Sequence, residues 1–80
     1  MTISTINFDA TCENLKELCA KKGYSASRLQ RELGLGSTQA VYKWFCHKDL
    51  TTVDNLVGIA SLLEVTIDDI CVTEDIEIGA

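Results

Sequence analysis

Apolar residues recur every three or four positions along most of this 80-residue chain, which is the spacing of amphipathic helices. The first predicted helix begins at a polar cap, either Asp9 or Thr11. It ends at Gly23, directly after Lys21 and Lys22, because glycine accepts the left-handed conformation and lysines suit a helix C-terminus. The apolar positions of this helix are Cys12, Leu15, Leu18 and Cys19.

Two shorter helices follow, joined by a tight connection that contains glycine. Ser25 caps the second predicted helix and Gly34 ends it, while Ser37 caps a third helix that runs to about Phe45. The inward-facing apolar residues of the two helices are Ala26, Leu29, Leu33, Val41, Trp44 and Phe45. Two helices joined in this way are typical of a helix-turn-helix, and Trp44 is expected to anchor the second of them in the core.

Two further helices complete the central part of the chain. Thr51 or Thr52 caps the fourth predicted helix, and the spacing from Thr51 to Asp54 fits a capping box. Thr66 caps a last short helix that runs through about Cys71. The apolar positions of these helices are Val53, Leu56, Val57, Ala60 and Leu63, then Ile67 and Ile70.

Both ends of the chain alternate between apolar and polar residues, as strands do. The stretches are TISTINF near the start and VTEDIEIGA at the end. They could pair within one chain or between two chains, and we expect one or both at a dimer interface. Residues 1–80 then form a single domain with a helical core of about residues 9–72, an N-terminal arm of residues 1–8 and an acidic tail of residues 73–80.

The charges are strongly divided along the chain. All seven basic residues lie between positions 16 and 48, where only two acids accompany them, so this segment carries +5. Residues 1–15 carry −2 and residues 49–80 carry −8, which gives the net charge of −5. Such a division favours one face for an anionic partner and another turned away from it, unless the charges mix in space once the chain folds.

Composition excludes several classes of protein. A hydrophobic content of 46% suits a globular chain with a small core and is too high for a disordered one. No apolar run is long enough to span a membrane, and the N-terminus has neither the basic nor the apolar region of a signal peptide. We therefore expect a cytoplasmic protein that does not contact membranes.

The four cysteines do not form the pattern of a metal site, because there is no C-x-x-C pair and the single His47 stands next to Cys46. In a reducing compartment we expect Cys12, Cys19 and Cys71 to be buried as small hydrophobic residues, and Cys46 to be exposed. The chain also has no glycine-rich phosphate loop and no defensible pair of catalytic residues. We therefore expect neither an enzyme nor a bound cofactor or metal.

Three stretches together resemble one family. They are NLKELCAKKGYSASRLQRELGL, VYKW and TTVDNLVGIASLLEVTIDDI, and their order matches the first two helices, the end of the recognition helix and the closing helices of the Cro/repressor-type (XRE) helix-turn-helix family. The resemblance covers about residues 14–72. It implies an all-α, five-helix, lambda-repressor-like helix-turn-helix domain, with short strands possible at its ends.

The chain departs from the family's usual pattern around the helix-turn-helix. One additional residue lies between Gly34 and Trp44, so the turn is longer. Gln30 stands where a small alanine usually lets the two helices approach, and His47 stands where the loop after the recognition helix usually has glycine. Ala26 replaces a glutamine that often contacts the DNA backbone.

The resemblance also implies a set of DNA contacts. In this family the third helix lies in the major groove with its N-terminal side chains at the base edges, which here are Thr38, Gln39 and Lys43. Glutamine can bond adenine N6 and N7, and lysine can donate to guanine O6 and N7. The implied DNA-backbone contacts are Ser25, Ser27, Ser37, Tyr42, His47, Lys48, Thr51 and Thr52.

The function that the resemblance implies is a sequence-specific transcriptional regulator, which binds a palindromic site in double-stranded DNA as a homodimer. An alternative stays open, namely a protein-interaction or antitoxin-like module that keeps the scaffold and binds a protein partner through its acidic C-terminal half. The sequence pI of about 4.6, Gln30 and the longer turn favour this alternative. The two differ in salt dependence, because binding to DNA weakens steeply as salt rises.

Overall fold

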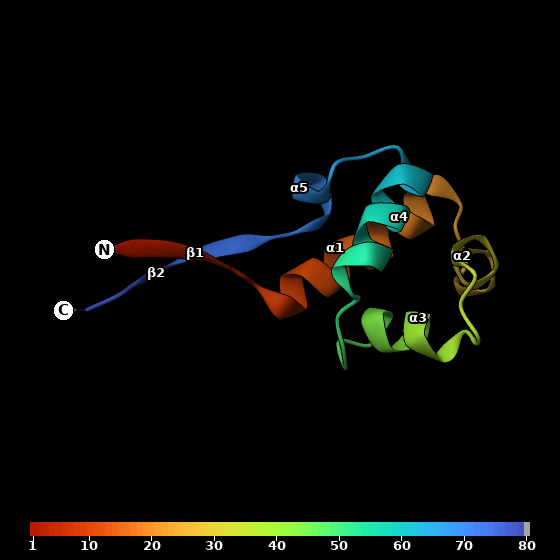
Figure 1. Cartoon of the computed structure of the whole chain (residues 1–80), viewed down its shortest axis with the longest axis horizontal. Helices are drawn as coiled ribbons and strands as arrows, with labels where there is room; N and C mark the ends of the chain where they lie inside the picture. Colours follow the sequence, from red (N-terminus) through yellow and green to blue (C-terminus); the bar gives the residue numbers. More distant parts are fainter. Residues whose placement is uncertain (80) are drawn as a thin grey trace.

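The computed structural model describes residues 1–79, and within them the chain folds into five helices and two short strands (Figure 1). The helices are α1 (Phe8–Lys22), α2 (Ala26–Leu33), α3 (Gln39–Phe45), α4 (Val53–Leu63) and α5 (Ile67–Ile70), and the strands are β1 (Thr2–Ile6) and β2 (Thr73–Glu77). The predicted fold class, five helices with short terminal strands, is confirmed. Ala80, the last residue of the predicted tail, lies outside the described residues.

The helices pack into one body, and β1 and β2 extend from it together (Figure 1). The two strands are antiparallel, with Thr2 opposite Glu77 and Ile6 opposite Thr73. We call this pair of strands the ribbon. The ribbon extends away from the helices, so the structure is elongated and measures 47 × 24 × 20 Å. Of the two pairings that the sequence left open, the structure has the one within a single chain.

The first helix begins earlier than predicted. Its cap is Asn7, whose side-chain oxygen accepts a hydrogen bond from the Ala10 N–H at 3.0 Å, so Asp9 lies inside the first turn. Thr11, the other predicted cap, is buried and bonds the chain at Val72. Its hydroxyl accepts from the Val72 N–H at 2.9 Å and donates to the Val72 carbonyl at 3.1 Å. These bonds tie the base of the ribbon to α1.

Two helices begin at the side-chain caps that the sequence predicts. Ser25 accepts from the Arg28 N–H at 3.2 Å at the start of α2. Thr66 caps α5 in a reciprocal capping box with Asp69. The hydrogen bond from the Thr66 backbone N–H lowers the pKa of the Asp69 carboxyl, because it favours the charged form. Local polar sequence signals therefore fix both helix starts.

Two caps were predicted for the fourth helix, Thr51 and Thr52, and the structure has Thr52. Thr52 caps it by accepting from the Asn55 N–H at 3.3 Å, so the capping box predicted from Thr51 is wrong. Val53 and Val57, predicted on the apolar stripe, are 73% and 51% exposed. The face that packs inward consists of Leu56, Ile59, Ala60 and Leu63. The valines therefore lie on the solvent side because the four inward positions already complete a helical stripe.

One cluster of buried side chains holds the helices together. Its members are Leu15, Cys19, Ala26, Leu29, Val41, Trp44, Leu56, Ile59, Ala60, Leu63 and Ile70. The predicted anchor Trp44 is confirmed, with 3% of its surface exposed. Helices α2 and α4 approach closely at Gly58, where a Cβ atom would lie 3.0 Å from Leu33 Cδ2. The ribbon contributes nothing to this cluster, and Ile67 of α5, predicted inward, is 36% exposed.

The four cysteines are free, and all of them except Cys71, which was predicted to be buried, lie as predicted. Cys12 and Cys19 are buried, Cys71 is partly buried and Cys46 is exposed. Burial raises the pKa of the Cys19 thiol to about 11, so this side chain stays neutral and acts as a small hydrophobic residue. None of the helices in residues 1–79 has the length and apolar character needed to cross a bilayer.

Candidate nucleic-acid interface

The turn into α3 is built around a left-handed glycine and a glutamine. Gly34 ends α2 with φ +68°, and its N–H bonds the Arg31 carbonyl at 3.3 Å. The next N–H, that of Leu35, bonds the Gln30 carbonyl at 3.0 Å. The Gln30 side-chain amide donates in return to the Leu35 carbonyl. The Gln30 amide therefore supplies a hydrogen-bond partner for a carbonyl of the turn into α3.

Ser37, the predicted cap of α3, does not cap it. The helix begins at Gln39, and the residue at the cap position is Thr38, which already has helical dihedral angles and makes no capping bond with its side chain. Thr38 is half-buried and Ser37 is exposed. The backbone is already helical at Thr38, one residue after the serine, so the cap predicted at Ser37 is wrong.

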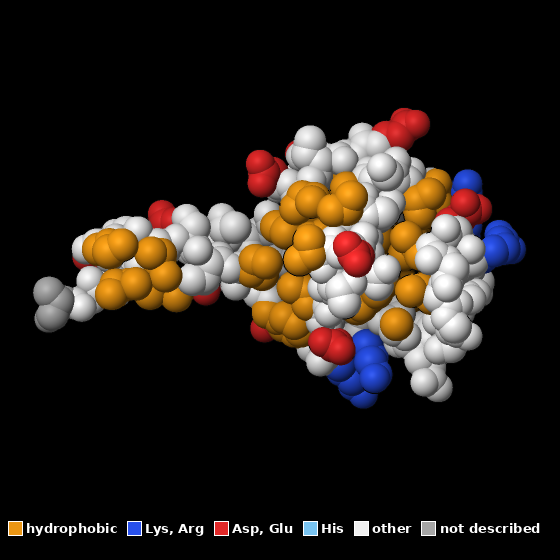
Figure 2. Space-filling model, in the orientation of Figure 1, with side chains coloured by type: hydrophobic (Ala, Val, Ile, Leu, Met, Phe, Trp, Pro, Cys, Tyr) orange, Lys and Arg blue, Asp and Glu red, His pale blue; other side chains and the backbone are white. Residues whose placement is uncertain are grey.

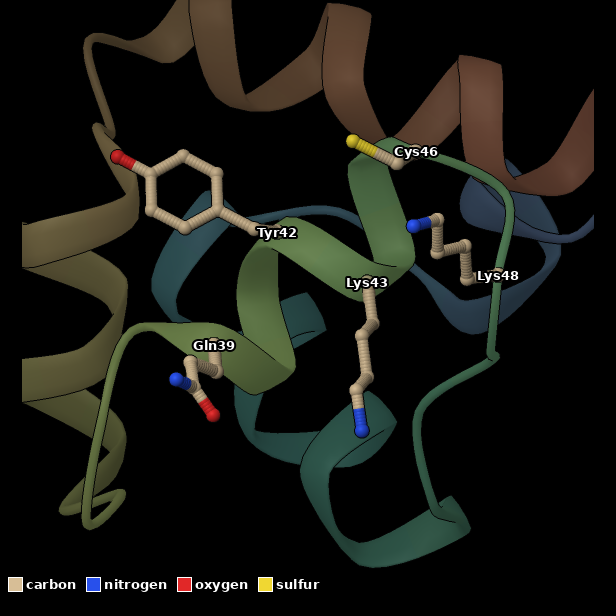
Figure 3. Close-up of a pocket in the computed structure, with 5 residues that line it drawn as sticks. All are labelled: Gln39, Tyr42, Lys43, Cys46 and Lys48. Atoms are coloured by element: carbon tan, nitrogen blue, oxygen red, sulfur yellow. The ribbon is translucent and has the colours of Figure 1, made fainter.

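The outward face of α3 collects the residues with DNA-binding chemistry. Val41 and Trp44 point into the core, and Gln39, Tyr42, Lys43 and Cys46 occupy the opposite side at spacings of three and four residues. These four residues and Lys48 line an open hollow of about 230 Å³. In Figure 3, Gln39 and Lys43 project on one side of the helix, Tyr42 and Cys46 project on the other, and Lys48 enters from the following loop.

The structure thus brings together four of the predicted contact residues, and it adds one that sequence reasoning did not assign to the site. Cys46 lines the hollow beside Tyr42 and Lys48. Its position seven residues after Gln39 places it on the same helical face, and this spacing is visible in the sequence.

The turn after α3 is built around His47, which has a positive φ and contacts α1. His47 has φ +59°, a conformation usually adopted by glycine, and the Lys48 N–H bonds the Lys43 carbonyl at 2.9 Å. The imidazole Nδ1 lies 3.2 Å from an Asp9 carboxylate oxygen, and Nε2 lies 3.2 Å from a Glu13 carboxylate oxygen. Both ring nitrogens are therefore engaged by α1. A phosphate contact from His47 would have to replace one of these two pairs.

The other predicted backbone contacts lie at two helix starts. Ser25 and Ser27 are exposed at the start of α2, where the Ser25 hydroxyl oxygen is the cap. Thr51 and Thr52 precede α4; Thr52 is the cap there, and the half-buried Thr51 donates to the Thr52 carbonyl at 3.4 Å. Arg28, which was not among the predicted contact residues, lies over the Tyr24 ring at 4.2 Å from its centroid.

The charges separate in space only in part. The ribbon carries Glu74, Asp75 and Glu77 at the far end of the long axis, and it holds no lysine or arginine. On the helical body acids and bases are interspersed, as Figure 2 shows for one face. Asp9 and Glu13 even lie next to the end of α3, against His47. The acidic tail is thus kept away from α3, whereas the remaining charges mix.

A comparison with protein families identifies this architecture. A family model described as the Cro/C1-type HTH DNA-binding domain matches residues 14–75. Because the match covers most of the chain, the protein belongs to this family of DNA-binding domains, which confirms the resemblance read from about residues 14–72. No curated protein and no solved structure matches the chain significantly.

Proposed function

We propose that this protein is a sequence-specific transcriptional regulator that binds a palindromic operator as a homodimer with α3 in the major groove. The observation that carries the proposal is the outward face of α3, where Gln39 and Lys43 stand one turn apart beside Lys48. An α-helix fits the width of the major groove, and side chains on its exposed face reach base edges. The family assignment supports DNA as the partner.

The proposed base contacts follow from side-chain chemistry. Gln39 bonds an adenine through its amide, and Lys43 donates to a guanine. Thr38, half-buried at the start of α3, offers a hydroxyl or a methyl group to the neighbouring base. Ala40 is partly buried and small, so it does not obstruct the approach of the helix.

The proposed backbone contacts surround this face. Lys48 contributes a charge and Tyr42, 54% exposed, contributes a hydroxyl. Hydroxyl and N–H groups at Ser37 and near the starts of α2 and α4 extend the footprint along the phosphates, through Ser25, Ser27, Thr51 and Thr52. For His47 we propose an indirect role. By contacting Asp9 and Glu13 it holds the loop that presents Lys48.

Dimeric binding follows from the small number of cations near α3. Only Lys43 and Lys48 line the hollow, so one protomer neutralises few phosphates and binds weakly. Two protomers on half-sites about one helical turn apart double the contacts and make the operator palindromic.

The test is selection of bound duplexes from a random DNA pool, repeated at several salt concentrations. We expect wild type to enrich a palindromic motif, and Gln39→Ala to relax one position in each half-site. Lys48→Ala serves as the contrast, because loss of a phosphate contact weakens all sequences alike and reduces the salt slope by about 1. Retention of no duplex by wild type even at low salt would contradict the proposal and favour a protein-binding role for this scaffold.

A further inference from the structure

The ribbon is exposed to a degree that is unusual for regular structure. Every described residue of β1 and β2 is exposed except Thr5, which is half-buried. The ribbon is joined to the helical body only at its base, where the Asn7 N–H bonds the Val72 carbonyl at 2.8 Å and Thr11 bonds Val72. An isolated pair of strands is at best marginally stable in water. The ribbon therefore lacks a packing partner within residues 1–79.

The two faces of the ribbon have opposite character. Because side chains alternate along a strand, Ile3 and its partner Ile76 lie on one face. Met1 and Ile78, which are joined by a backbone hydrogen bond of 2.7 Å, continue the same face toward the tip. These four residues form what we call the isoleucine face, and each is at least 40% exposed. Figure 2 shows hydrophobic side chains gathered on the ribbon.

The other face carries Ile6 at its base, and its remaining side chains are polar and hydrogen-bond one another across the strands. The Thr2 hydroxyl donates to Glu77 at 2.7 Å, and the Ser4 hydroxyl donates to Asp75 at 2.9 Å. The hydrogen bond from Thr2 lowers the pKa of the Glu77 carboxyl, so this face stays charged at neutral pH. Two charges lie at the ends of the isoleucine face, namely Glu74, opposite Thr5 at the base, and the Met1 ammonium at the tip, which lies 3.3 Å from a Glu77 carboxylate oxygen. The central pair of that face is therefore uncharged.

The charge and the size of the ribbon indicate which kind of partner binds the isoleucine face. The ribbon has acids and no basic side chain, so nucleic acid and anionic membrane surfaces are repelled. A second copy of the same face meets it without like charges at the centre, and both acidic faces then point outward. The face is small compared with a stable interface, so it suits a partner already held nearby. A second protomer on the neighbouring half-site is such a partner.

We propose that the isoleucine face is the contact between two copies of this chain, and that it makes their binding to paired half-sites cooperative. The identity of the partner rests on the proposed DNA-binding function. The existence of the contact does not, because it can also be measured without DNA.

The first experiment compares two variants that remove isoleucines of similar exposure from opposite faces. Ile3→Ser with Ile76→Ser alters the isoleucine face, whereas Ile6→Ser alters the other face, since Ile6 is 44% and Ile3 40% exposed. On DNA with two half-sites, the double variant is expected to lose about 10²-fold or more in affinity, while its affinity for one half-site stays unchanged. Ile6→Ser is expected to bind both DNAs as wild type does. Equal losses in the two variants would overturn the proposal.

The second experiment guards against simple unfolding of the ribbon. Ile76→Lys and Ile76→Glu are each expected to abolish association, as measured by sedimentation at high protein concentration. An equimolar mixture of the two is expected to associate again, because opposite charges then meet at the contact. Unfolding of the ribbon would not be rescued by mixing. A wild type that stays monomeric both in concentrated solution and on paired half-sites would overturn the proposal.

The two experiments separate the two ideas. If no DNA is bound but wild type forms dimers that Ile3→Ser with Ile76→Ser disrupts, the DNA-binding function fails and the contact stands. If a palindromic DNA is bound without cooperativity and without dimers in solution, the function stands and the contact fails.

Discussion

The turns before and after α3 hold the same helix by different means. Before it, the Gln30 amide donates to a carbonyl only five residues further along the chain. After it, His47 contacts Asp9 and Glu13, which are 38 and 34 residues away. The first interaction is local and half-buried, and the second joins a histidine to carboxylates, is distant in sequence and is more exposed.

This difference has consequences for the two ends of the DNA-reading face. The start of α3 depends on a bond that forms whenever α2 and the turn are formed. The end of α3 and the adjacent Lys48 depend on α1 being packed in place. An exposed contact between a side chain and a carboxylate contributes little to stability, whereas a half-buried carbonyl left without its donor costs more. We therefore expect the entry turn to be more sensitive to substitution than the exit turn.

The largest effect is expected from removing the anchor that both turns share. Trp44→Ala deletes a side chain that is 3% exposed and should lower the free energy of unfolding by about 3–5 kcal/mol. Urea unfolding followed by circular dichroism measures this loss. Tyr42→Ala on the outward side of the same helix is the matched control, expected to change stability by less than about 0.5 kcal/mol. Equal losses would show that α3 is not anchored through its inward face.

A smaller effect is expected from replacing the hydrogen-bond donor of the entry turn with an acceptor. Gln30→Glu keeps the shape of the side chain but presents a carboxylate, in place of an amide donor, to the Leu35 carbonyl. The unpaired carbonyl should lower the free energy of unfolding by about 1–3 kcal/mol in the same urea measurement. Gln39→Glu makes the same chemical change at an exposed site and should be nearly neutral. If the two variants are equally stable, the amide does not hold the turn.

The smallest effect is expected at the exit turn, where two contributions can be separated. His47→Ala loses the contacts with Asp9 and Glu13 and keeps the positive φ, whereas His47→Gly loses the same contacts and relieves the backbone. Glycine should be more stable than alanine there by about 1 kcal/mol. Glu64 has φ +57° at the end of α4 and makes no ion pair with the other described residues, so Glu64→Gly and Glu64→Ala should differ by the same amount.

One outcome at His47 would contradict the expectation that the entry turn is more sensitive to substitution than the exit turn. If His47→Gly, which relieves the backbone, still lowers the free energy of unfolding as much as Gln30→Glu does, the contacts of His47 with α1 dominate the exit turn. The exit turn would then be as demanding as the entry turn, and the comparison between them would fail.

Much of the fold could be predicted from local sequence signals. Ser25 and Thr66 cap helices, and Gly23 and Gly34 end them in the left-handed conformation, because these residues act on neighbouring backbone groups. The helical spacing of apolar residues also predicted that Trp44 would be buried. The order of these elements was sufficient to predict the family, which the match over residues 14–75 confirms.

The sequence predictions were wrong where residues close together in the sequence are equally suited to cap a helix or to lie on its buried face. Asp9, Thr11 and Ser37 are all sound capping residues by type, but Asn7 caps α1 and no side chain caps α3. Val53 and Val57 fit a helical stripe as well as the residues that are buried. Local patterns leave such choices open by one or two residues, and packing against other helices decides them.

The sequence by itself determined the helices, their order and the outward chemistry of α3, because each depends on spacings within one or two turns. Only the tertiary structure decided that His47 meets Asp9 and Glu13, that Thr11 secures the base of the ribbon through Val72, and that the two chain ends pair. These contacts join residues more than 30 positions apart. No local pattern specifies them, because their geometry exists only after the helices have packed.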